Sequence, residues 1–473
     1  EQTGTTVPTE QAEGLLEHGT AEVRRRVLGL LGDEADRGLT RTVANFLQDR
    51  DAAVRLEAAR YLYRTHGCGH LPLLKQGLEH PDVRVRAAAV GVVAECGDEK
   101  ERALITDDVL HPLLTADGPG ATDARIEATK ALAALAQPNH LRLLRDLLDD
   151  PDPEVVAAAA RACGRTGNRM FVARLLRLLG EKPHEAAARE ALLDYGERIF
   201  GTLYDYLTDD SVEERIRRNI PRMLEELPSQ AAVDLLLLSL ERLRAPLLYD
   251  VAKALNKLRE QNPGLRFYSA PIDAAVRAEM RALATVQAAL YHHARSDDEH
   301  AAHPAAREVH RALKQERTQT LERVFRLLGL RYPSADMHSA YRGLTESADL
   351  RAPAAEFLDS VLDWEYKRHL VPLLDEAPDE GDVRVAEEMA EKAFPTWQAA
   401  LEDLLLDRHP RPLACALAAV PEALPDRLAE LAFAACTPDP TDDPPEMRDD
   451  PPAPFRPPAS NGAPDRAAET RRR

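Results

Sequence analysis

A short repeated phrase organises the first half of the chain. It is clearest as Asp51-Ala-Ala-Val-Arg-Leu-Glu-Ala-Ala59 and returns as Asp82-Val-Arg-Val-Arg-Ala-Ala-Ala-Val90. We call the apolar residue in its fourth position the marker. Successive markers are 31, 31, 41, 29, 31, 30 and 31 residues apart, and the long interval holds the turn-rich stretch 115–122. Such a period predicts a repeat architecture. The markers are Val23, Val54, Val85, Ile126, Val155, Ala186, Ile216 and Leu247.

Apolar or small residues follow most markers at the fifth and eighth positions, as Ala160 and Cys163 follow Val155. That spacing places them on one face of a helix. A second apolar stretch, such as 141–148, precedes each phrase, so each unit is predicted to be two short antiparallel helices. One such hairpin cannot bury both of its faces, and the units must therefore stack. We predict an all-α fold, a right-handed α-solenoid of stacked helix hairpins.

Residues that can cap helices stand three positions before five of the markers. A side-chain oxygen there accepts hydrogen bonds from free amides of the first turn and contributes about 1 kcal/mol. Pro221 falls inside a predicted helix and therefore predicts a kink or a late helix start. The predicted caps are Thr20, Asp51, Asp82, Asp123 and Asp152.

The units resemble HEAT repeats, armadillo-type helix pairs, in the short form also seen in phycobilisome-lyase-type repeats. Further phrases at 217–224, 254–259, 322–330 and 356–359 resemble the soluble HEAT region that follows the membrane domain in bacterial ATP/ADP translocase-like proteins of the major facilitator class. This likeness covers roughly residues 15–420. It departs from that family in lacking transmembrane helices and a cyclic-nucleotide-binding module, so the residues present are not expected to transport.

The organisation changes along the chain, and five segments are predicted. Two longer amphipathic helices replace the short units after residue 262. The Pro-rich, acidic C-terminal segment can bury too little apolar area to offset the conformational entropy that it would lose on folding. The segments are a flexible N-terminal stretch (1–14), a HEAT-like array (15–262), two longer helices with a polar connector (263–332), further HEAT-like or helical repeats (333–436) and a disordered tail (437–473).

Charge and composition exclude several classes of function. A formal net charge of −19 argues against binding nucleic acid along the chain. No apolar run approaches the length that would span a bilayer, so this chain is not expected to insert directly into a membrane. Five scattered cysteines fit a reducing compartment better than a disulfide framework, which predicts a cytoplasmic protein. It would be tethered to the inner membrane if it is part of a larger transporter-like protein, a reading that the non-Met start at Glu1 also prompts.

Arginine follows the marker in several units and forms the one candidate partner surface. Such a column could hold anionic partners, or it could be a ladder in which each arginine pairs with an Asp of its own or an adjacent unit. Glu127, Val156, Ala187 and Leu248 interrupt the column, which favours the ladder. Its members are Arg24, Arg55, Arg86, Arg217 and Arg351.

Metal and catalytic candidates are weaker. His66-Gly-Cys-Gly-His70 has zinc-type ligands but no second pair, and is better explained as a turn between units. The histidines at 292, 293, 300, 303 and 310, with Asp297, Asp298 and Glu299, favour a solvated linker over a divalent-ion site.

An enzymatic function is not predicted. A glycosylase or lyase would use Trp364 or Trp397, which lie outside the regular array, and no nucleotide-binding or hydrolase motif is present. We predict no catalytic, cofactor-binding or metal-binding residue and no small-molecule substrate. The expected function is a non-catalytic scaffold whose surface binds a protein or domain partner. The alternative is the cytoplasmic regulatory region of a nucleotide (ATP/ADP) transporter-like membrane protein, without its membrane domain.

Overall fold

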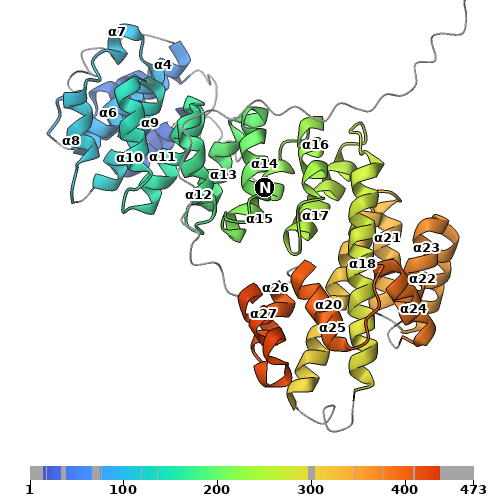
Figure 1. Cartoon of the computed structure of the whole chain (residues 1–473). Helices are drawn as coiled ribbons and strands as arrows, with labels where there is room; N and C mark the ends of the chain where they lie inside the picture. Colours follow the sequence, from blue (N-terminus) through green and yellow to red (C-terminus); the bar gives the residue numbers. More distant parts are fainter. Residues whose placement is uncertain are drawn as a thin grey trace, which may run out of the picture. The chain divides into compact units, whose positions relative to one another are not determined.

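The computed structural model describes residues 14–436, apart from 18, 33–38, 67–74, 76, 82, 119, 136, 297–303, 347, 376–377 and 408–410. The described residues form helices joined by turns and contain no strand (Figure 1). They divide into two compact units, unit 1 (Glu1–Tyr195) and unit 2 (Gly196–Arg473). Among the described helices, none combines the length and apolar character needed to cross a bilayer.

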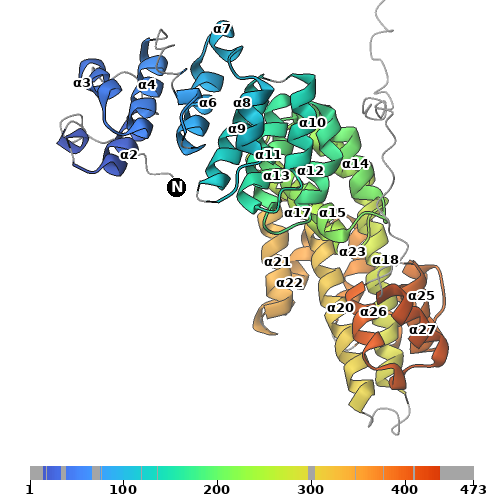
Figure 2. The ribbon, with the colours of Figure 1, turned by 90° about the vertical axis from the view of Figure 1, so that its left-hand side faces the viewer.

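Unit 1 contains two layers of helices. The marker helices, which we call the B layer, pack each against the next in chain order, and Figure 2 shows α4, α6 and α9 side by side. The shorter A-layer helices α3, α8, α10 and α12 pack behind them. The B layer is α2 (Ala21–Gly32), α4 (Ala52–His66), α6 (Val83–Cys96), α9 (Ala121–Leu135), α11 (Pro153–Thr166) and α13 (Glu185–Leu193). The A layer is α3 (Thr40–Asn45), α8 (Asp107–Leu114), α10 (Pro138–Leu147) and α12 (Val172–Leu179), with α7 (Glu99–Arg102) and the 3-10 turns η1 (Phe46–Gln48) and η2 (Arg169–Phe171) between elements.

The stack forms because each B helix buries a stripe that its neighbours cover. In α11, Val155, Ala159, Ala162 and Cys163 are fully buried, at the marker and the fourth, seventh and eighth positions after it. The same positions of α4, ending at Leu62, are buried as well. Small residues in this stripe let adjacent helices approach closely. The predicted all-α solenoid of stacked hairpins is confirmed.

The predicted register is wrong in two helices. In α9 the predicted marker, Ile126, is only half-buried, whereas Ala124, Ala128 and Leu132 are fully buried. The marker of α9 is therefore Ala124, two residues earlier. In α13 the predicted Ala186 is exposed, and the buried set starts at Ala187.

The register error in α9 has a local cause. Asp123 resembles a cap in the sequence but lies inside the first turn, because α9 already begins at Ala121, just after a turn with positive φ at Gly118 and Gly120. Because the marker itself is a small alanine, the sequence pattern points to the larger apolar residue Ile126 instead.

Two other caps behave as predicted. Asp152 accepts a hydrogen bond from the Glu154 amide, and Asp51 accepts from the amides of Ala53 and Val54. The Thr20 carbonyl accepts the Arg24 amide at the start of α2, while Asp82 lies outside the described residues.

Unit 2 begins with two further marker helices and then changes character. Pro221 is buried inside α15, so the predicted late helix start at this proline is wrong. The helices are α14 (Phe200–Thr208), α15 (Glu214–Leu224), α16 (Gln230–Ser239), α17 (Leu247–Gln261), α18 (Ser269–Ala294), α20 (Pro304–Leu328), α21 (Ser334–Glu346), α22 (Ala348–Val361), α23 (Trp364–Leu370), α24 (Glu380–Ala390), α25 (Trp397–Asp407), α26 (Arg411–Ala418) and α27 (Asp426–Cys436). The 3-10 turns are η3 (Gly196–Ile199), η4 (Pro372–Leu374) and η5 (Pro421–Ala423).

The long helices α18 and α20 pack together and organise the rest of unit 2. Helices α24 and α25 contact α18, while α17, α21 and α26 contact α20. One apolar core joins Val286 and Leu290 of α18 and Leu313 of α20 to Trp397 and Leu401 of α25. Helices far apart in sequence are therefore neighbours here, unlike the next-in-line contacts of unit 1.

One cysteine expectation is wrong. Cys415 of α26 and Cys436 at the end of α27 form a disulfide, with 4.8 Å between their Cα atoms. Their separation of 21 residues hid the pair in the sequence. The two helices pack against each other as a hairpin and bring the two thiols together.

Candidate interaction face

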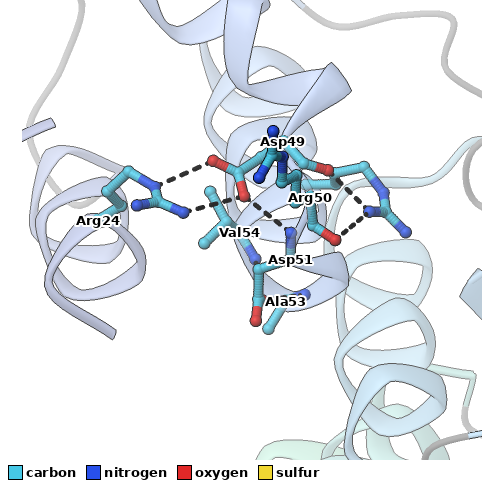
Figure 3. Close-up of polar contacts among 7 residues, drawn as sticks. Arg24, Asp49, Arg50, Asp51, Ala53 and Val54 are labelled. Atoms are coloured by element: carbon cyan, nitrogen blue, oxygen red, sulfur yellow. Dashed lines mark hydrogen bonds and ion pairs between the residues drawn. The ribbon is translucent and has the colours of Figure 1, made fainter. Parts of the chain in front are cut away.

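Arg24 links neighbouring units, as the ladder hypothesis proposes. Its guanidinium donates two hydrogen bonds, of 2.9 and 3.1 Å, to the carboxylate of Asp49, just before the next B helix (Figure 3). Asp49 also accepts the Asp51 amide at 2.8 Å, so it joins the ladder to the cap of α4. Burial alone would raise the pKa of Asp49, but the Asp51 amide and the Arg24 charge lower it on balance.

Arg55 and Arg86 make the same contact one repeat apart. Arg55 Nη1 donates to the carbonyls of Asp49 and Arg50, at 2.8 and 3.2 Å. Arg86 Nη1 donates to the carbonyls six and five residues before it, those of His80 and Pro81, at 2.8 and 2.9 Å. Each arginine therefore satisfies carbonyls in the turn that leads into its own helix.

Arg217 and Arg351 in unit 2 also donate to carbonyls, but to carbonyls of the helix that precedes their own. Arg217 Nε donates to the Leu207 carbonyl in the last turn of α14, at 3.0 Å, and its Nη2 lies 2.8 Å from the Asp210 carboxylate. Arg351 Nε donates to the Leu344 carbonyl near the end of α21, at 3.3 Å. Leu350, the apolar residue before Arg351, is exposed, so it does not act as a buried marker.

Arg125 is a further member that the sequence interpretation missed. With Ala124 as the marker, Arg125 occupies the column position that had been assigned to Glu127. Its Nη1 donates to the Ala116 carbonyl at 3.1 Å, and its side chain lies 3.3 and 3.7 Å from the carboxylates of Asp150 and Asp152. These arginines contact carbonyls and carboxylates, and the side chains of Arg24, Arg125 and Arg217 are only 14%, 15% and 9% exposed. Both observations favour the ladder over an anion-binding column.

A second basic column lies on another side of the B helices. The sixth position after the corrected markers is Arg60 in α4, Gly91 in α6, Lys130 in α9 and Arg161 in α11. At 100° per residue this position is far around the helix from the Arg ladder. We call Arg60, Lys130 and Arg161 the basic stripe. The register error in α9 concealed it from the sequence analysis.

Helix α6 contributes Gly91, and no cation, at this position, and the missing side chain has a structural consequence. A Cβ atom placed on Gly91 would lie 2.3 Å from a carboxylate oxygen of Glu127 and 3.2 Å from Arg60 Nη2. The missing side chain lets Arg60 of α4 and Glu127 of α9 approach across α6, with 3.9 Å between their charged groups. Arg60 also lies 3.3 and 3.7 Å from the carboxylates of Glu57 and Glu95.

A hollow of about 270 Å³ opens beside the stripe, between α9 and α11. Lys130 of α9 and Arg161 of α11 both line it, and Lys130 Nζ lies 2.7 Å from Glu127. Arg161 lies 3.8 Å from Glu190 of α13. The full lining is Ile126, Lys130, Glu154, Ala157, Ala158, Arg161 and Arg165. Its polar members are largely exposed, which suits recognition at a surface more than chemistry in an enclosed site.

The metal and nucleophile candidates are not brought together. In the described part of the chain, no three His, Cys, Asp or Glu side chains could hold a metal ion. His293 is buried instead, with its ring 5.5 Å from His310 and 5.2 Å from Trp397. Burial and nearby Lys314 lower the pKa of His310. Segments 67–70 and 297–303, which hold the other metal candidates, lie outside the described residues.

The remaining candidates have structural surroundings. Cys163 is fully buried, and burial raises the pKa of its thiol to about 12, which disfavours the nucleophilic thiolate. Trp397 is a core residue, whereas Trp364 is 70% exposed at the start of α23. The two tryptophans therefore do not line a shared cleft within unit 2.

A buried ionic network in unit 2 was missed entirely. Arg323 of α20 donates to Glu279 of α18 at 2.7 Å and to Glu316 at 3.1 Å, and all three side chains are at most 7% exposed. Thr320 donates to Glu316 and accepts from Arg323. The only feature of the sequence that could have predicted this network is the presence of charged residues on the apolar faces of two long helices.

Comparison with known proteins agrees with the architecture of unit 1. Residues 11–94 and 108–194 match the family model for HEAT repeats. Both regions lie within unit 1, which therefore contains HEAT repeats. The comparison with curated proteins found no match for the chain.

Proposed function

We propose that the chain is a non-catalytic HEAT-repeat scaffold that binds a protein or domain partner through the B-layer face of unit 1. The observation that carries this proposal is the outer face of α4, α6, α9 and α11, where the basic stripe, its acidic partners and the hollow meet. HEAT repeats commonly present such surfaces, and a stack of packed helices offers its face without having to fold on binding.

The Arg ladder has a supporting part in this proposal. Arg24 and Arg125 hold one unit to the next through Asp49, Asp150 and Asp152, while Arg55 and Arg86 fix the turns that lead into their own helices. The distances between neighbouring B helices are therefore fixed before the partner binds. Neither nucleic acid nor a small-molecule substrate is part of the proposed function.

Photo-crosslinking in the source organism tests the proposal. A photoreactive amino acid at Glu154 or Arg165 should crosslink to one partner, which is then purified and shown to bind the chain directly. The matched controls are Arg142 and Asp146, exposed residues of α10 in the A layer. Equal crosslinking from both layers, or no direct binding by the purified partner, would contradict the proposed face.

A second candidate is the cytoplasmic regulatory region of a nucleotide transporter-like membrane protein. The phrases at 217–224, 254–259, 322–330 and 356–359 support it. The partner would then be the membrane domain of the same protein. Sequencing the gene upstream of Glu1 tests this: a series of long apolar helices is expected, and their absence would remove the candidate.

The cytoplasm is the proposed compartment, and the disulfide makes that part of the proposal testable. A reducing cytoplasm would open the disulfide, so Cys415 and Cys436 should titrate as free thiols in protein trapped with an alkylating reagent inside intact cells. If they are instead blocked as the disulfide seen in the structure, an oxidising compartment replaces the cytoplasm in this account.

A further inference from the structure

The residues that line the hollow between α9 and α11 carry more positive than negative charge, although the chain as a whole is acidic. Lys130, Arg161 and Arg165 face one carboxylate, that of Glu154, among its lining residues, in a chain whose formal net charge is −19. Arg165 is exposed and makes no hydrogen bond or ion pair within the part of the chain that the structure describes. Glu127 and Glu190, outside the lining, pair with Lys130 and Arg161, so the side chain of Arg165 is the cation that remains to complement an anionic partner.

The floor of the hollow is apolar. Ile126, Ala157 and Ala158 supply it, and Ile126 is kept half-exposed by the register of α9. Pockets for drug-sized ligands or cofactors occupy roughly 300–1,000 Å³. A hollow of about 270 Å³ is better matched to one or two side chains of a peptide.

The spacing of the cations also matches a peptide. Packed helices lie roughly 8–10 Å apart, so Lys130 and Arg161, at the same position of adjacent helices, belong to a stripe with about that repeat. A chain in the extended polyproline II conformation repeats every three residues, which span roughly 9 Å, so every third side chain lies on the same face. Carboxylates at every third residue of such a segment could therefore meet successive helices. A nucleic-acid backbone fits less well, because Glu127, Glu154 and Glu190 stand among the cations and would repel closely spaced phosphates.

We infer that this hollow binds an extended acidic segment of a partner protein, with a leucine-sized side chain on the Ile126 floor and carboxylates on Lys130, Arg161 and Arg165. The inference rests on the proposed function and specifies the chemistry of the partner. Attraction between exposed charges is screened by salt, so binding should weaken as ionic strength rises.

Fluorescence anisotropy with the full chain tests the inference. The probe is a labelled peptide of four Glu-Ser-Leu repeats, and the comparison peptides are four repeats of Lys-Ser-Leu and of Glu-Ser-Ser. The Lys-Ser-Leu peptide is expected to bind at least about 10-fold more weakly because its charge is reversed. The Glu-Ser-Ser peptide is expected to lose at least about 10-fold because it has no leucine side chain to bury. Equal binding of the Glu and Lys peptides would overturn the inference.

Charge reversal on the protein locates the site. Lys130→Glu/Arg165→Glu should weaken the Glu-Ser-Leu peptide about 10-fold or more and strengthen the Lys-Ser-Leu peptide, while Arg142→Glu on α10 should change neither. Circular dichroism checks that the variants remain folded. If Arg142→Glu weakens binding as much as the double variant, the hollow is not the site.

The failures of the two proposals can be told apart. Crosslinking from Glu154 to a purified partner without any preference among the three peptides would leave the interaction face standing and refute the acidic segment. Peptide binding that is insensitive to Lys130→Glu/Arg165→Glu, together with no crosslinked partner, would refute both.

Discussion

Units 1 and 2 are both all-helical, but different contacts hold them together. In unit 1, polar contacts such as Arg24 with Asp49 and Thr122 with Asp152 join residues about one repeat apart, and Arg60 reaches Glu127 two repeats on. In unit 2, Asn256 donates to the Arg326 carbonyl 70 residues away, and Arg281 pairs with Glu391 at a separation of 110. Repetition places polar contacts at the rims of a stack, whereas the non-repetitive unit buries ionic groups in its core.

The two units can be followed separately in one sample. Both tryptophans of the chain, Trp364 and Trp397, belong to unit 2, and Trp397 is buried. Tryptophan fluorescence therefore reports unit 2 alone, while circular dichroism reports helices of both units.

The largest effect is expected from Arg323→Met. It leaves Glu279 and Glu316 buried without the guanidinium they share, which should destabilise unit 2 by about 3–5 kcal/mol. Urea unfolding followed by tryptophan fluorescence measures the loss. The control replaces all three residues together, as Glu279→Met/Glu316→Leu/Arg323→Met, and should recover most of the stability. A midpoint unchanged in Arg323→Met would show that the network contributes nothing.

Gly164→Ala should destabilise unit 1 by about 1–3 kcal/mol. A Cβ atom at Gly164 of α11 would lie 2.7 Å from the Cα atom and 2.8 Å from the carbonyl oxygen of Ala191, so α11 and α13 would have to move apart. Circular dichroism should detect an earlier transition while tryptophan fluorescence stays unchanged. A simultaneous shift in both signals would mean that the units unfold together.

Lowering the pH should decrease the stability of α2 and α4, at the start of unit 1, because Asp49 becomes protonated. Because its pKa is lowered in the folded chain, its contribution is present above the unfolded pKa of about 3.9 and is lost as pH falls through the lower folded value. Asp49→Asn should remove this dependence and destabilise α2 and α4 by about 1 kcal/mol at pH 7. Hydrogen exchange of these helices between pH 6 and 2.5 measures it. Parallel pH profiles for both proteins would contradict the assignment.

The smallest effect is expected from Gly91→Ala. The added methyl group meets only the movable end of Glu127 and the guanidinium of Arg60, so these side chains can swing away. Alanine favours the helix by roughly 0.5–1 kcal/mol, and an exposed ion pair contributes less, so unit 1 should become slightly more stable. Calorimetry compares this variant with Gly164→Ala, and destabilisation of equal size would show that the stripe is rigidly packed across α6.

The stacked fold could be predicted because the same apolar stripe returns in each unit. The stripe of Val155, Ala159 and Cys163 needs only helical geometry to be recognised. It was harder to predict which residues of α9 face the core. Ala124 is a weaker apolar signal than Ile126, and the turn at Gly118 and Gly120 places the helix start earlier than Asp123 suggests. That error alone hid Arg125 from the ladder and Lys130 from the basic stripe.

Contacts between distant segments could not be predicted from periodicity. The pairing of Glu279 with Arg323 depends on how α18 meets α20, and the Cys415–Cys436 disulfide depends on the hairpin of α26 and α27. A single sequence contains no repeat that reports either arrangement. The candidate arginines remain a predicted partner surface, and the carbonyls that Arg55 and Arg86 contact could not be predicted from their spacing.

Hydrogen–deuterium exchange of the full chain, with and without its crosslinked and purified partner, tests the central claim most directly. The partner is expected to slow exchange in α9, α11 and neighbouring B-layer helices and to leave α10, α12 and unit 2 unchanged. Protection centred on the A layer or on unit 2 would contradict it.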